Sequence, residues 1–381
     1  MSTDTRSGKS VYFFYFAASA TLAPQLTYYY RSVGLSGREV GILAAIAPLA
    51  SILGASLWGA VADLTGRHRA MLVCAIAGSI ASAQLLALGA GFPTLFLFAV
   101  LLSLMYAPVM PIIDKSVLAT LGSKADRYGR IRIWGAAGWG IAAPPAGLLI
   151  GRLGLGIIFP AHGALMAICL IASFRLPVGQ GRSVVKIRRG LGVILRDKRW
   201  VFFLLAVFAR GVGGAFIHHY LMVYLGELGA SAMLRGLALT AATVSELVAF
   251  YFADRLLRRF GAERIILISI GATALRLFLH FLIQAPVAIL AVQLLHGATF
   301  SIFLVAGVRL ANDLAPKGME TTAQALFTAT HFGAGGIVGG YIGGELLDLV
   351  GVHRMYLIAS VATFLGLVAF LTFRWRTRAH R

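Results

Sequence analysis

Cysteine and acidic residues are both scarce in this chain of 381 residues. The two cysteines, Cys74 and Cys169, each fall inside a long apolar run, so we expect neither a disulfide framework nor a metal site. Aspartate and glutamate number 14 against 34 lysines and arginines. The chain has no convincing nucleotide-binding loop or hydrolase constellation, and no loop long enough for a soluble phosphate-binding domain. These absences argue against an ATP-driven pump and against an enzyme, and they predict no cofactor.

Apolar sequence, in contrast, is abundant. Hydrophobic residues make up 59% of the chain and charged residues 13%, and the mean hydropathy is +0.84, far from the composition of a soluble domain. We identify twelve runs of about 20 residues, each long enough as a helix to cross a hydrocarbon core of roughly 30 Å. The first is 11–31, which we interpret as a retained helix rather than a signal peptide, and the last is 354–373. The sequence therefore predicts an all-α membrane protein with twelve transmembrane helices.

The basic residues are unevenly distributed between the two sides of these runs. With the N-terminus placed in the cytoplasm, 27 of the 34 lie in the tails and the cytoplasmic loops, five lie on the other side and two lie within runs. This asymmetry follows the positive-inside rule, and it predicts a bacterial-type inner membrane with both termini in the cytoplasm. The net charge of +20 thus reports topology and contact with anionic lipid, and we expect no nucleic-acid partner.

The chain also divides into two similar halves. A polar, basic segment at 177–199 separates residues 1–176 from residues 200–381, with six apolar runs in each half. "WGAVADLTGRHRAML" in the first half is echoed by "FYFADRLLRRFGAERIIL" in the second, which places Asp63 and Asp254 half a chain length apart. We therefore predict two pseudo-symmetric six-helix bundles joined by a cytoplasmic linker, and we expect a monomer.

The repeated loop carries the first resemblance to a known family. "GAVADLTGRHR" resembles the gating loop of the major facilitator superfamily, and the second copy keeps an aspartate but inserts four residues before its glycine. Physically, an aspartate at a helix end can be held by a neighbouring helix N-terminus in one conformation and released in another. The residues that the resemblance assigns to gating are Gly59, Asp63, Gly66, Arg67, Arg69 and, in the second copy, Asp254.

A second stretch narrows the resemblance. "PIIDKSVLATLGSKADRYGRIRIWGAAGW" is similar to lactose permease-like proton symporters and to the related 3-phenylpropionate transporters. The resemblance implies that Asp114 and Arg132 bind substrate and that Trp139 stacks on it; an equally simple interpretation makes Asp114 and Arg132 a salt bridge at a loop. Tyr15 and Tyr220 are further candidates for aromatic walls of the substrate site.

Four ionisable residues on four different predicted helices form a candidate cluster. Counting from the helix ends places Glu246, Arg276 and His296 roughly 12 to 17 Å below the outer surface, and Arg210 lies at a similar depth. A charge in the bilayer centre costs at least about 2.5 kcal/mol, so we expect these groups to face the interior and pair there. They form either a proton-coupling site or a static network that locks helices together, in which a neutral histidine only bonds across helices. The lactose permease-like pattern has a second glutamate where this chain has Thr299, which favours Glu246 as the proton carrier.

These features predict a secondary transporter whose two bundles rock about a central cavity. The resemblance favours proton-coupled uptake of a small organic solute such as an aromatic carboxylate. Sugar or nucleoside symport and proton-coupled efflux stay open as alternatives within transport. A membrane sensor that kept the fold without transporting is the alternative from a different class.

Overall fold

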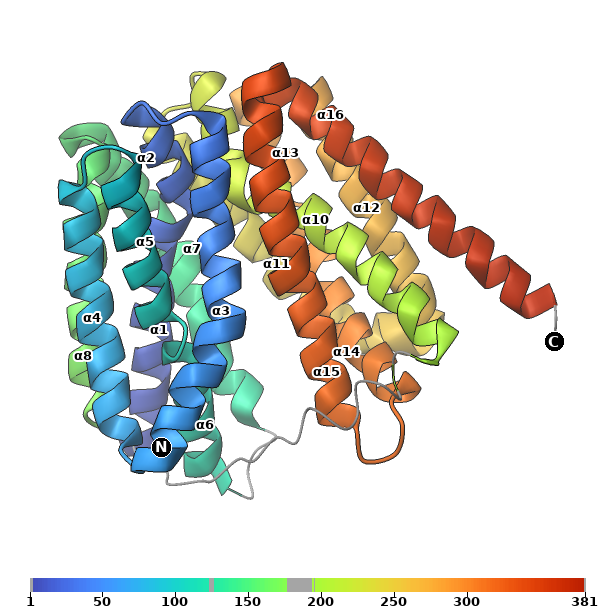
Figure 1. Ribbon diagram of the computed structural model, residues 1–381, viewed down its shortest axis with the longest axis horizontal. Helices are drawn as coiled ribbons and strands as arrows, with labels where there is room; N and C mark the ends of the chain where they lie inside the picture. Colours follow the sequence, from blue (N-terminus) through green and yellow to red (C-terminus); the bar gives the residue numbers. More distant parts are fainter. Residues whose placement is uncertain (1–2, 123–126, 177–193, 195, 380–381) are drawn as a thin grey trace. The chain divides into compact units, whose positions relative to one another are not determined.

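The computed structural model describes residues 3–122, 127–176, 194 and 196–379, and the regular structure of these residues is entirely helical (Figure 1). Ten stretches among them are long and apolar enough to cross a membrane. The last of the ten, Glu320–Leu371, has 52 residues and includes a break at Gly351, whose φ of 76° interrupts α16 (Gly335–Ala379). An all-helical architecture is thus observed, and the count of twelve helices stays a prediction.

The described helices fall into two compact units. Unit 1 comprises Met1–Leu35, Leu49–Ser183 and Gly229–Thr243, and unit 2 comprises Ser36–Pro48, Val184–Leu228 and Val244–Arg381. Two helices, α3 (Gly37–Thr65) and α11 (Ala232–Phe260), begin in one unit and continue in the other. The units therefore do not divide at a single point of the sequence, and most of the predicted linker at 177–199 lies outside the described residues.

Unit 1 is a bundle in which α1 packs against α7 and α8, and α4 packs against α5 and α8. The close approach of α1 and α7 depends on Gly138, because a Cβ there would lie 2.1 Å from the carbonyl oxygen of Phe13. Large buried side chains such as Tyr12, Leu72 and Ile76 fill its core. Its helices are α1 (Thr3–Leu22), α2 (Leu26–Ser32), α4 (His68–Leu88), α5 (Phe92–Tyr106), α6 (Val109–Leu121), α7 (Tyr128–Leu153) and α8 (Ile158–Ser173).

Unit 2 is organised around α16, against which α10 and α12 pack. Glycines allow this contact: a Cβ on Gly335 would lie 2.8 Å from the Cα of Gly211. Two short π-helical turns, η4 and η5, interrupt its helices, and such turns commonly mark functional sites. Its further elements are α10 (Lys198–Glu227), α12 (Ala262–Leu282), α13 (Pro286–Gln293), η4 (Gly297–Ser301), α14 (Ile302–Leu314), α15 (Glu320–Thr328) and η5 (Ala329–Ala334).

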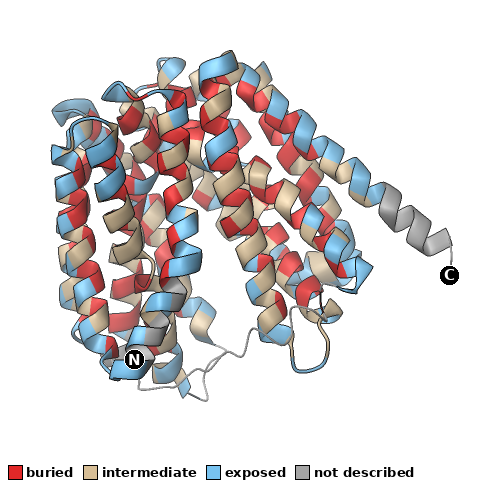
Figure 2. Cartoon of the chain, viewed as in Figure 1, coloured by how far each residue is buried: buried red, intermediate tan, exposed pale blue. Residues whose placement is uncertain are grey.

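Many large apolar side chains point away from both cores. Leu57, Leu88 and Leu349 are 63%, 79% and 75% exposed, and exposed faces run along most helices (Figure 2). Such extensive apolar surface would be unfavourable in water, where soluble monomers rarely expose large contiguous apolar patches. These faces suit contact with lipid, as the hydropathy of the sequence predicts.

Candidate functional site

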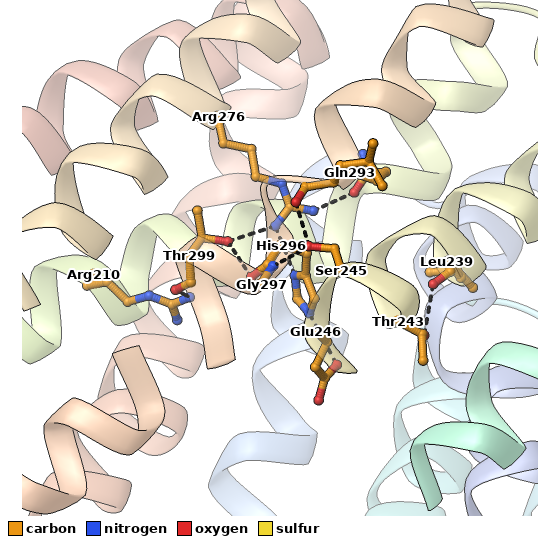
Figure 3. A network of polar contacts seen from close by, with 11 residues as sticks. Arg210, Leu239, Thr243, Ser245, Glu246, Arg276, Gln293, His296, Gly297 and Thr299 are labelled. Atoms are coloured by element: carbon orange, nitrogen blue, oxygen red, sulfur yellow. Dashed lines mark hydrogen bonds and ion pairs between the residues drawn. The ribbon is translucent and has the colours of Figure 1, made fainter. Parts of the chain in front are cut away.

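The four ionisable residues predicted to cluster do lie together, all within unit 2 (Figure 3). Arg210 comes from α10, Glu246 from α11 and Arg276 from α12, and His296 directly precedes the π-helical turn η4. The grouping follows from packing: each helix turns its few polar side chains away from the apolar exterior and toward its neighbours.

Arg276 is the centre of the cluster and is only 3% exposed. Its Nη1 donates to Nδ1 of His296 at 2.9 Å and to Oγ1 of Thr299 at 3.1 Å, and its Nη2 donates to Oε1 of Gln293. The three acceptors are spaced three residues apart, so one short stretch of chain surrounds the guanidinium. Three hydrogen bonds offset part of the cost of burying this charge.

The contact with Arg276 fixes the protonation of His296. A guanidinium can only donate hydrogen bonds, so Nδ1 of His296 accepts and carries no proton. In the neutral ring the proton is on Nε2, which lies 3.7 Å from Oε2 of Glu246. The side chains of His296 and Glu246 are 27% and 22% exposed, so they form the most exposed edge of the cluster. A second proton can enter His296 only if Arg276 moves away.

Arg210 is a second buried cation, 4% exposed. Its Nη1 donates to Nε2 of His331 at 2.7 Å and its Nη2 to the carbonyl oxygen of Thr299, while its guanidinium lies 4.7 Å from the ring centre of Phe303. Thr299 therefore serves both arginines, with its hydroxyl toward Arg276 and its carbonyl toward Arg210.

Positive charge exceeds negative charge in this cluster. Within the described part of unit 2, neither Arg210 nor Arg276 forms an ion pair with a carboxylate, and the Nε of each has no hydrogen-bond partner. Glu246 reaches the arginines only through His296. Two buried cations face one partly exposed carboxylate, an arrangement that attracts an additional anion.

Close backbone packing brings Glu246 to the edge of the cluster. Its neighbour Ser245 accepts from the backbone N–H of Gly297 at 2.7 Å and donates to the carbonyl of Leu294. A Cβ at Gly297 would lie 2.3 Å from the backbone oxygen of Ser245, so only glycine permits this contact between α11 and η4.

A separate polar group lies in unit 1. Asp114 accepts hydrogen bonds from the hydroxyls of Tyr12 and, at 2.9 Å, of Tyr128. Arg132 lies against aromatic rings, 4.4 Å from the ring centre of Phe16 and 5.3 Å from that of Tyr12. The described residues contain no ion pair between Asp114 and Arg132, so the alternative of a loop salt bridge finds no support.

The three aromatic candidates differ in their surroundings. Trp139 is half-buried on α7. Tyr15 is 7% exposed and packs against Phe16 and Tyr106. Tyr220 is fully buried, and its hydroxyl donates to the carbonyl of Gly340, so it joins α10 to α16. The structure therefore uses Tyr15 and Tyr220 in packing.

The predicted gating loop is only partly described. α3 runs through Gly59 and Asp63, but the side-chain surroundings of both lie outside the described part of the chain. The turn itself is formed by Gly66 at a φ of +66°. Of the remaining motif residues, Arg67 precedes α4, Arg69 donates to the carbonyl of Leu176 at 3.2 Å, and Asp254 is exposed on α11.

Sequence reasoning missed Gln293, Thr299 and His331 as members of the cluster. The spacing of three residues between 293, 296 and 299 was a usable signal, because it places polar groups near one another on a helical turn. No comparable signal links His331 to Arg210, which is 121 residues away in the sequence.

Comparison with known proteins supports the family assignment. Residues 6–358 match the MFS_1 like family. The chain is 27% identical to a maltose permease of Geobacillus stearothermophilus, over 96% of this chain and 94% of the relative. It is 24% identical to a probable 3-phenylpropionic acid transporter of Escherichia coli, over 92% and 93%. The crystal structure of the nucleoside transporter NupG superposes with a TM-score of 0.87 at 18% identity, covering 97% of this chain and 99% of that one.

The resemblance read from the loop motif is thus confirmed, and the NupG structure supports the same fold. The relatives are transporters, and such proteins are not enzymes. The chain belongs to the MFS_1 like family and is a multi-pass membrane transporter.

Proposed function

We propose that this chain is a secondary active transporter that couples proton entry to the uptake of a small organic anion, with aromatic carboxylates as the substrate class. The observation that carries the proposal is the imbalance of charge in unit 2, where buried Arg210 and Arg276 face only Glu246. The 3-phenylpropionic acid transporter among the relatives supports the same class of solute.

The same imbalance supplies a physical basis for coupling. With Glu246 ionised, the two arginines and the carboxylate carry a net charge of +1; protonation of Glu246 raises the charge to +2. An anion then binds more favourably, and by linkage a bound anion favours protonation of Glu246. Couplings of this kind are typically worth about 1 to 3 kcal/mol, or about 5-fold to 150-fold in affinity. Proton and anion therefore enter together.

His296 transmits this change to the buried arginines. While Arg276 donates to its Nδ1, its Nε2–H lies toward Glu246, 3.7 Å from Oε2. Protonating Glu246 removes the negative charge in front of His296, and a substrate carboxylate can then compete for the Nη1 donor of Arg276. The bidentate geometry of a guanidinium suits a carboxylate ligand.

Unit 1 offers a second set of groups suited to the same class of solute. Arg132, Asp114 and the ring of Trp139 remain candidates for substrate contact, and the loop carrying Asp63 remains the candidate gate for alternating access. We further propose a monomer in a bacterial-type inner membrane, with both termini in the cytoplasm, on the strength of the asymmetric basic loops.

Sugar or nucleoside symport is the second candidate. Asp114, held by two tyrosine hydroxyls, resembles the acceptor groups that bind sugar hydroxyls. A maltose permease and a nucleoside transporter are also among the similar proteins. Efflux and a non-transporting sensor have no comparable feature in their favour.

Uptake by purified protein in liposomes with an imposed pH gradient tests the proposal. Labelled 3-phenylpropionate, maltose, uridine and a cationic dye are compared, and protein-free liposomes correct for permeation of the weak acid. We expect saturable accumulation of 3-phenylpropionate that Arg276→Gln abolishes. Arg309→Gln is the matched control, because Arg309 is exposed and pairs with Asp313 on the same helix. Accumulation of maltose or uridine instead would favour the second candidate, and outward movement of the dye would favour efflux.

A further inference from the structure

A closed ring of three hydrogen bonds braces Arg276 beyond its contacts with His296 and Thr299. Nη2 of Arg276 donates to Oε1 of Gln293, and Nε2 of Gln293 lies 3.2 Å from Nε2 of His280. Nδ1 of His280 in turn lies 2.6 Å from the backbone carbonyl oxygen of Arg276. Gln293 and His280 are both fully buried, and the ring joins α12 to the end of α13 through direct contacts.

Each bond in this ring has only one possible direction. The carbonyl oxygen of Arg276 can only accept, so His280 carries its proton on Nδ1, and Nε2 of the neutral ring is an acceptor. The amide nitrogen of Gln293 must then donate to His280, which turns the amide oxygen toward the guanidinium. The ring is satisfied without any negative charge.

A carboxylate at position 293 would have a different effect. Glutamate has nearly the same shape as glutamine and would form an ion pair with Arg276. Its second oxygen would face the lone pair on Nε2 of His280, which is unfavourable in the neutral tautomer that the ring requires. The amide avoids this conflict and leaves the charge of Arg276 uncompensated. An unpaired charge inside the membrane costs free energy, and residues that carry such a charge usually have a function.

We propose that Gln293 determines the charge selectivity of the transport site. Its neutral amide orients Arg276 and preserves the positive charge, so that the site takes a carboxylate in preference to a neutral solute of the same shape. His280 acts as a positioning residue, because it fixes which way the amide of Gln293 points. This inference rests on the proposed function, in which the buried arginines bind the anion.

A pair of nearly isosteric probes tests the inference: 3-phenylpropionate and its neutral amide, 3-phenylpropionamide. Binding of each labelled compound to purified protein is measured by equilibrium dialysis, and the readout is the ratio of the two affinities. Gln293→Glu neutralises Arg276 from one position. Thr299→Glu neutralises it from another, because Oγ1 of Thr299 accepts from the same guanidinium. Gln84→Glu is the control: Gln84 lies in unit 1, where its Nε2 donates to the carbonyl of Phe159 at 2.8 Å.

We expect the wild-type protein and Gln84→Glu to bind the carboxylate more tightly than the amide. In both neutralising variants the ratio of the two affinities should fall by a factor of at least about ten, within the usual range for coupled charges. Gel filtration identifies folded protein, and the second variant keeps the test decisive if the first does not fold. An unchanged ratio in either folded variant overturns the role of Gln293. If the wild-type protein binds neither compound, the proposed function is contradicted. That result differs from an unchanged ratio in a variant, which contradicts only the role of Gln293.

Discussion

Replacing Glu246 by glutamine should separate binding from energy coupling. The substitution keeps the shape of the side chain and mimics its protonated form, 3.7 Å from Nε2 of His296 and in front of two buried arginines. A unit charge at about 8 Å from a bound anion is worth roughly 2 kcal/mol at an effective dielectric constant of about 20. Because Glu246 is partly exposed, we discount this value and expect Glu246→Gln to bind 3-phenylpropionate about tenfold more tightly at neutral pH.

A transport assay distinguishes substrate binding from energy coupling directly. In liposomes, Glu246→Gln should exchange preloaded substrate across the membrane, because exchange need not release the proton, but it should fail to accumulate substrate under a pH gradient. Asp313→Asn is the control, since Asp313 is an exposed carboxylate paired with Arg309. Normal accumulation by Glu246→Gln would refute the reasoning. Loss of binding and exchange together would assign Glu246 to the substrate site rather than to coupling.

Three further changes have defined outcomes. Arg132→Lys and Arg132→Ala should both weaken substrate affinity, because lysine lacks the planar fork that grips a carboxylate in two places; full affinity in both variants contradicts this role. Asp63→Asn should slow transport and leave substrate affinity within a few-fold of the wild type, and unchanged transport rates in correctly inserted protein would contradict a gating role for Asp63. Gly297→Ala should destabilise the protein by about 1 to 3 kcal/mol, because its Cβ would clash with the backbone oxygen of Ser245, and an unchanged thermal midpoint would show that the contact relaxes.

Four residues of the candidate site could be predicted from their distance to the helix ends alone. Arg210, Glu246, Arg276 and His296 were expected at one level because the distance to a helix end converts directly into depth, and the structure brings all four together. The hydrogen-bond partners of the two arginines were harder to predict from the sequence. Neutral side chains such as Gln293 do not stand out in a search for charges inside apolar runs, and Thr299 lies in the π-helical turn η4, which no local pattern indicates.

Other features depend on contacts between distant parts of the chain. Tyr12 bonds to Asp114 across 102 residues, and no local pattern indicates which hydroxyl will meet that carboxylate. The sharing of α3 and α11 between the two units is likewise invisible to composition, which predicts a division only at the polar segment 177–199. Local patterns therefore predicted an all-helical membrane protein and the grouping of the four ionisable residues, while long-range packing determined the hydrogen-bond partners.

Proton uptake on substrate binding tests the central claim most directly. Purified protein is titrated with 3-phenylpropionate by calorimetry in buffers of different ionisation enthalpy, across a range of pH. The account predicts that the wild-type protein takes up protons, at most one for each anion bound, and that Glu246→Gln takes up none. Anion binding without proton uptake, or equal uptake by the wild-type protein and the variant, would contradict coupling through Glu246.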